Sequence, residues 1–194
     1  MINKHYSTRE LIQISMFTAI MVVFAQIAIP LPVSPIPLTL STFAIFLSSS
    51  FLTPQCAFMV QVIYILLGAI GFPVFSGFKS GIQVISGPTG GYIISYLIMA
   101  PLISFLSVRL QYKTSLLRKI RVPLSHIISY AVAMVFCYGF GSLWLMLYIK
   151  VPFSQALALA VTPYLLADTL KIVLCSFIVF PLKKALASFF PYRA

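Results

Sequence analysis

The chain alternates between long apolar runs and short breaks that are rich in proline, glycine or basic residues. Six apolar segments predict helices, at about residues 11–29, 40–53, 56–71, 90–108, 125–148 and 162–181. A helix needs about 20 residues to cross the hydrocarbon core of a bilayer, so the second and third segments are short for a full span. The pattern predicts an all-α integral membrane protein with six transmembrane helices, in a single domain over residues 1–194.

Two of the breaks differ from ordinary polar loops. Residues 30–39 are apolar and carry four prolines in eight residues, which a helix interior does not tolerate. We expect a stiff, extended loop that packs against the helices or against a ligand. Residues 72–91 are rich in glycine and proline, and Thr89 is placed to cap the fourth helix.

Composition supports the membrane prediction and excludes one alternative. The chain is 61% hydrophobic and only 8% charged, whereas soluble domains are about 25% charged. The net charge of +11 is typical of nucleic-acid-binding proteins. Here, however, the basic residues gather at the ends of apolar runs and not along one face, so nucleic acid is excluded as a partner and the lipid bilayer is the expected environment.

The positions of the basic residues predict the orientation. Of 13 Lys and Arg residues, ten lie in the N-terminal leader, in residues 109–124 or in the C-terminal tail, and only Lys79 and Lys150 lie in the other loops. The positive-inside rule therefore places both termini in the cytoplasm. We expect a multi-pass protein of the bacterial cytoplasmic (inner) membrane, with loops 30–39 and 72–91 on its outer side.

Asp168 and Lys171 are unusual residues for the last apolar segment. Asp168 is the only carboxylate in the apolar body, because the other acidic residue, Glu10, lies in the polar leader. Lys171 lies on the same helical face, and a charge at the centre of a membrane helix costs about 2.5–3.5 kcal/mol. Counted from residue 162, the pair is expected about 9–14 Å deep. Either the two charges pair only to fix helix packing, or they line a polar pocket in which Lys171 meets an anionic group and Asp168 accepts N–H hydrogen bonds.

Other residues are candidates for this pocket or for contact with a partner. Gly90 and Gly91 open the fourth helix and offer free backbone N–H groups, although a plain helix start is the alternative. Aromatic residues of the second loop can wall the pocket or simply pack: Phe72, Phe75, Phe78 and Tyr92. Ser15 and Ala19 have the small-xxx-small spacing that allows close approach of a partner helix or packing within the bundle.

No residue set indicates an enzyme. The chain has no GxxxxGK[ST] motif, no HExxH motif and no Ser/His/Asp set, so we predict no nucleotide hydrolysis, catalytic residue, metal site or cofactor. His126 has no second histidine nearby in the sequence and is expected to be structural. The two halves show no inverted repeat, which argues against a large secondary transporter. These exclusions favour a small membrane-embedded protein that binds a compact organic anion.

Four motifs, in this order, resemble the BioY family. They are Pro35-Ile-Pro-Leu-Thr39, Gly68-Ala-Ile-Gly-Phe-Pro-Val-Phe75, Gly87-Pro-Thr-Gly-Gly-Tyr92 and Asp168-x-x-Lys171. The family comprises the biotin-binding S components of energy-coupling factor (ECF) vitamin transporters. The resemblance implies a six-helix S-component fold, high-affinity capture of biotin from outside, and contact of Asp168 and Lys171 with the vitamin under the outer loops. Further candidates for substrate contacts are Thr39, Ser41, Lys79, Gly90, Gly91, Tyr92 and Tyr164.

Two of these candidates depart from the family's pattern. Ser41 stands where the family often has glutamine, and its side chain is too short for the same reach. Lys79 stands at a position that varies in the family, and it either adds a second partner for an anion or points to water. Both departures concern individual contacts rather than the class of ligand.

The resemblance also implies partners. Uptake needs energy, so a transmembrane coupling subunit and two ATPase subunits of an ECF module are expected, although solitary operation stays open. Ser15 and Ala19 match the small-residue face with which such S components dock. The alternatives are an S component for another small vitamin and a membrane scaffold in which the Asp168–Lys171 pair is only structural.

Overall fold

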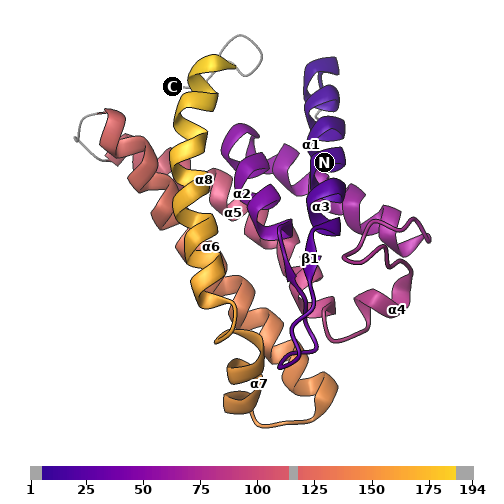
Figure 1. The fold of residues 1–194 in the computed structure, drawn as a ribbon. Helices are drawn as coiled ribbons and strands as arrows, with labels where there is room; N and C mark the ends of the chain where they lie inside the picture. Colours follow the sequence, from indigo (N-terminus) through magenta and orange to yellow (C-terminus); the bar gives the residue numbers. More distant parts are fainter. Residues whose placement is uncertain (1–5, 114–117, 187–194) are drawn as a thin grey trace, which may run out of the picture.

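The computed structural model describes residues 6–113 and 118–186, and it is mostly helical (Figure 1). The helices are α1 (Thr8–Gln26), α2 (Ser41–Phe51), α3 (Pro54–Ala69), α4 (Ile82–Ile85), α5 (Gly90–Lys113), α6 (Arg118–Ile149), α7 (Phe153–Ala160) and α8 (Leu165–Ala185). Two short strands, β1 (Ala28–Ile29) and β2 (Leu38–Thr39), pair antiparallel. The all-α prediction is therefore wrong in this detail, because the proline-rich loop is a hairpin whose two ends share backbone hydrogen bonds.

Four of these helices are long and apolar enough to cross a membrane: Thr8–Gln26, Gly90–Gln111, Val122–Ile149 and Leu165–Ala185. Helices α2 and α3 are apolar but have only 11 and 16 residues, fewer than the roughly 20 of a full span. Among the described residues, the fold thus has four clear spans and two shorter apolar helices. Crossing of the membrane by α2 and α3 stays a prediction.

The sequence explains where several helices begin. Ser7 and Glu10 form a reciprocal capping box at the start of α1, with Ser7 Oγ accepting from the Glu10 N–H at 3.2 Å. Thr53 caps α3, and Pro54 occupies its first turn. Helix α8 begins at Leu165, three residues later than expected.

The later start of α8 moves the charged pair toward the helix end. Asp168 lies in the first turn and Lys171 in the second, about 5–9 Å from the start of the helix instead of the expected 9–14 Å. The positive end of the helix dipole favours a carboxylate at this place. The local field of α8 therefore stabilises the negative charge of Asp168.

The helices bring the 30–39 and 72–91 segments to one end of the bundle (Figure 1). Helix α5 packs against α2, α3 and α6, and α8 packs against α2 and α6. The start of α1 and the end of α8 lie at the top in Figure 1, whereas the β1–β2 hairpin, α4 and α7 lie toward the opposite end. Several basic residues used for the orientation lie outside the part of the chain whose side chains are described: Lys4, Lys113, Arg118, Lys119, Arg121 and Arg193.

Candidate functional site

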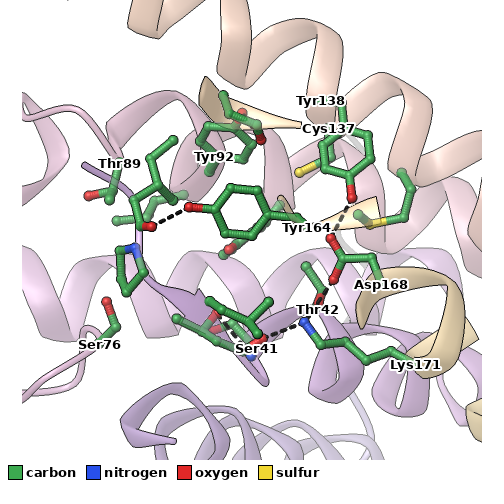
Figure 2. A pocket seen from close by; sticks show the side chains of 18 of the residues that line it. Ser41, Thr42, Ser76, Thr89, Tyr92, Cys137, Tyr138, Tyr164, Asp168 and Lys171 are labelled. Atoms are coloured by element: carbon green, nitrogen blue, oxygen red, sulfur yellow. Dashed lines mark hydrogen bonds and ion pairs between the residues drawn. The ribbon is translucent and has the colours of Figure 1, made fainter. Parts of the chain in front are cut away.

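A cavity opens at the end of the bundle that carries the β1–β2 hairpin (Figure 2). It encloses about 650 Å³ of space not filled by protein atoms, part of it open to solvent. Its walls come from the hairpin, from the loop after α3 and from α2, α3, α5, α6, α7 and α8. Five tyrosines line it together with apolar side chains and one charged pair: Tyr64, Tyr92, Tyr96, Tyr138 and Tyr164.

Lys171 makes three hydrogen bonds at the cavity wall. Its Nζ lies 2.7 Å from Asp168 Oδ1. It also donates to the backbone oxygen of Thr39 at 2.6 Å and to Thr42 Oγ1 at 3.3 Å. An ammonium group has three N–H donors, so these contacts use all of them and tie α8 to β2 and α2.

Asp168 has acceptor capacity to spare. Its Oδ2 accepts a hydrogen bond from the Tyr138 hydroxyl at 2.5 Å, while Oδ1 faces Lys171. Figure 2 shows Tyr138 and Lys171 approaching the carboxylate from two sides. A carboxylate offers about four lone-pair sites, so about two remain for a ligand. Asp168 and Lys171 are only 6% and 7% exposed, and pairing is what makes such burial of charge tolerable.

The structure thus contains the ion pair and the cavity together. The two interpretations of the pair in the sequence, a packing contact or a pocket wall, do not exclude each other. The two charges hydrogen-bond to one another, and both also line the cavity.

Two tyrosines fasten the segments around the opening. The Tyr164 hydroxyl donates to the backbone oxygen of Ile36 in the hairpin. The Tyr92 hydroxyl donates to the backbone oxygen of Ala160, the last residue of α7, at 3.2 Å. The hairpin is therefore held at Ile36 by Tyr164 and at Thr39 by Lys171.

The loop after α3 supplies one aromatic wall. The Phe75 ring packs where Gly68 has no side chain, since a Cβ there would lie 2.1 Å from the ring. It also meets the Tyr64 ring edge-on at 5.5 Å. Phe72 and Phe78 are 55% and 71% exposed and do not line the cavity, so only Phe75 and Tyr92 of the four predicted aromatic residues do.

Gly90 and Gly91 serve helix packing. A Cβ on Gly91 would lie 2.2 Å from Trp144 Cβ, and one on Gly90 would lie 1.7 Å from the backbone oxygen of Ile85. The Trp144 indole also donates to the backbone oxygen of Gly87 at 2.9 Å. Close approach of the end of α4 therefore requires Gly90, and close approach of α6 requires Gly91.

The predicted site residues divide into two groups. Six line the cavity: Thr39, Ser41, Tyr92, Tyr164, Asp168 and Lys171. Three are not part of its lining: Gly90, Gly91 and Lys79, whose side chain is exposed. Their roles toward a ligand stay predictions.

The remaining candidates lie away from the cavity. Ser15 and Ala19 are exposed on α1 and do not pack within the described bundle. His126 is buried beside Ser50 Oγ at 3.4 Å and Lys183 Nζ at 3.3 Å. Within residues 6–113 and 118–186, no group of three or more His, Cys, Asp or Glu side chains is placed to hold a metal ion.

The sequence interpretation missed three cavity tyrosines. Tyr96 was predictable, because it lies one helical turn after Tyr92 and therefore on the same face of α5. Tyr64 and Tyr138 lie on α3 and α6, and no local pattern connects either of them to Asp168.

The chain is similar along nearly its whole length to one family of membrane proteins. The model of the BioY family matches residues 1–188. Identity is 35% over 174 residues with the biotin transporter BioY2 of Lactococcus lactis, covering 90% of both chains. It is 35% over 176 residues with the biotin transporter BioY of Thermotoga maritima, covering 91% of this chain and 96% of that protein. The solved S component for biotin from an ECF-type ABC transporter aligns with a TM-score of 0.81 at 23% identity, over 93% of this chain and 95% of that one, which shows the S-component fold.

Proposed function

The chain belongs to the BioY family, and from this premise we propose that it is the S component of an ECF transporter and captures biotin on the outer side of the bacterial cytoplasmic membrane. It is a transporter component and not an enzyme. The observation that carries the proposal is the buried Asp168–Lys171 pair in the wall of a tyrosine-rich cavity. Intramembrane ionisable residues are candidates for a ligand site by default.

The chemistry of the cavity fits the groups of biotin. Biotin has one carboxylate, a ureido group with two N–H donors and one carbonyl, and apolar rings and tail. The free acceptor sites of Asp168 suit the two ureido N–H groups. The tyrosine rings and Phe75 provide apolar contact area for the ring system.

Lys171 would bind the ligand only by exchanging a partner. Its three donors already meet Asp168, Thr39 and Thr42. An anionic or carbonyl oxygen of the ligand would replace one of these acceptors, and the neutral backbone oxygen of Thr39 is a weaker partner for an ammonium than a carboxylate is. The hydroxyl of Thr42 is also neutral and lies farther away, at 3.3 Å. We therefore expect Lys171 to exchange Thr42 or Thr39 before Asp168.

Energy for uptake would come from partner subunits. The proposed partners are a transmembrane coupling subunit and two ATPase subunits, with both termini of the chain in the cytoplasm. The exposed positions of Ser15 and Ala19 on α1 support a docking face there. Replacing Ala19 by Trp should abolish energised uptake in cells while leaving biotin binding by the purified chain unchanged, and unchanged uptake would contradict the docking role.

Calorimetric titration of the purified protein tests the substrate. We expect biotin to bind in the nanomolar range, far more tightly than riboflavin or thiamine, and Lys171→Ala and Asp168→Asn to lose that affinity. Lys150→Ala is the matched control, because Lys150 is exposed in a connecting loop away from the cavity. If biotin binds no better than the other vitamins, the proposal of biotin fails. If both cavity variants bind like the wild type, the assignment of the site fails.

A further inference from the structure

Gln26, the last residue of α1, reaches across to the loop that follows α3. Its Nε2 donates to the backbone oxygens of Val74 at 3.0 Å and Pro73 at 3.3 Å. Its Oε1 accepts from the backbone N–H of Phe78 at 2.9 Å. A single amide group thus contacts the backbone on both arms of this loop.

The residues between these contacts form part of the cavity wall. Phe75 and Ser76 line the cavity, and the loop closes on itself through a hydrogen bond from Phe75 N–H to the Lys79 oxygen at 3.0 Å. Phe78 has a φ of 58°, a left-handed conformation that side chains other than glycine disfavour. Because Gln26 accepts the N–H of this residue, it stabilises the backbone at a strained position.

We propose that Gln26 is a positioning residue, which holds the 73–78 loop as a wall of the substrate cavity and thereby links that wall to α1. The inference rests on the proposed function, since the consequence to be measured is retention of biotin. Gln26 touches the loop and not the cavity, so its effect on the ligand is exerted through Phe75 and Ser76.

Gln26 lies on the same face of α1 as the proposed docking residues. At 3.6 residues per turn, Gln26 lies within about 20° of both Ser15 and Ala19 around the helix axis. Those two residues are exposed, whereas Gln26 is half-buried against the loop. A partner lying along this face would end beside the loop, and tilting of α1 would move the anchor of the cavity wall.

The test uses Gln26→Met, which keeps the length of the side chain and removes its donors and its acceptor. Gln83→Met is the matched control, because Gln83 is exposed and its amide donates only to the nearby Ser80 oxygen at 2.8 Å. Stopped-flow measurement should show at least tenfold faster biotin dissociation for Gln26→Met, with association within threefold of the wild type. Hydrogen exchange of the biotin-free protein should accelerate in residues 73–79 and stay unchanged in the control.

The outcomes separate this inference from the proposed function. Dissociation within twofold of the wild type overturns the positioning role, even if exchange of the loop accelerates, and so does a loss of affinity that arises only from slower association. If the wild type does not bind biotin, the proposed function fails, and hydrogen exchange still decides whether Gln26 holds the loop. Should Gln26→Met not fold, Gln26→Glu replaces it, since a carboxylate lacks the donors for Pro73 and Val74 and should accelerate exchange in the same residues.

Discussion

Asp168→Asn separates a ligand site from an ion pair that is only structural. Asparagine matches aspartate in shape, but it lacks the charge and replaces one acceptor oxygen with an NH₂ donor. If its remaining oxygen accepts from Tyr138, the NH₂ group faces the Lys171 ammonium, because these two neighbours contact different oxygens of Asp168. In that orientation the variant loses an attractive contact and gains a repulsive one. In the flipped orientation the oxygen accepts from Lys171 and the NH₂ group donates to the Tyr138 hydroxyl oxygen, so the variant loses the charge of the carboxylate and its free acceptor sites.

The expected effect on biotin affinity follows from the contacts that the carboxylate offers. A hydrogen bond to a charged group contributes about 1.5–3 kcal/mol. At about 1.4 kcal/mol per tenfold, loss of one such bond weakens binding about 10- to 150-fold. Removing one partner of a buried pair also destabilises a protein by about 3–5 kcal/mol. A smaller loss is expected here, because Lys171 keeps its hydrogen bonds to Thr39 and Thr42.

Calorimetry on the monodisperse fraction, together with thermal unfolding without ligand, measures both effects. The double variant Asp168→Asn/Lys171→Met is the decisive comparison, since it removes the unpaired charge along with its partner. For a ligand site, the double variant regains stability but still binds biotin weakly. A dissociation constant for Asp168→Asn within threefold of the wild type would refute the reasoning, and the pair would then be a packing contact.

Two further substitutions test the surroundings of the pair. Tyr138→Phe removes one donor to Asp168 and should weaken biotin binding about tenfold by calorimetry; unchanged affinity would mean that the hydroxyl does not orient the carboxylate. Gly68→Ala places a Cβ 2.1 Å from the Phe75 ring. It should lower the free energy of unfolding by about 1–3 kcal/mol and speed biotin dissociation. The control Gly139→Ala, with nothing within 4 Å of its Cβ, should leave the free energy of unfolding and the dissociation rate unchanged in the same assays.

The charged pair was predictable from the sequence because an apolar chain makes every internal charge conspicuous. The partners of the pair were not predictable. Tyr138 is one of ten tyrosines, and its contact with Asp168 depends on how α6 crosses α8. The contact with the backbone oxygen of Thr39 was not predictable either, because a pattern of side chains does not show where backbone oxygens lie. It is nevertheless the shortest contact that Lys171 makes.

The prolines predicted local structure better than the glycines did. The prolines of residues 30–39 correctly exclude a helix, but the strand pair closes at Ala28 and Thr39, outside the prolines themselves. Gly90 and Gly91 have two possible uses, exposure of backbone N–H groups or room for a neighbour. Both uses require only the absence of a side chain, so the sequence does not distinguish them. In the structure the backbone oxygen of Ile85 fills the room at Gly90, and Trp144 fills the room at Gly91.

The proposed contact of Lys171 with the substrate would link binding to the hairpin, because Lys171 also holds Thr39. A buried charge without partners is costly, so a cavity that must persist without ligand needs its ammonium satisfied by the protein. Thr39 supplies one such contact from the hairpin. A ligand oxygen that takes its place releases β2 from α8, while Tyr164 still holds the hairpin at Ile36. The hairpin would then be free to adjust around a ligand without leaving the opening. Its two attachments have different expected consequences. Loss of Tyr164 would release the hairpin at Ile36 while Lys171 still holds Thr39, whereas exchange of Thr39 at Lys171 would accompany binding.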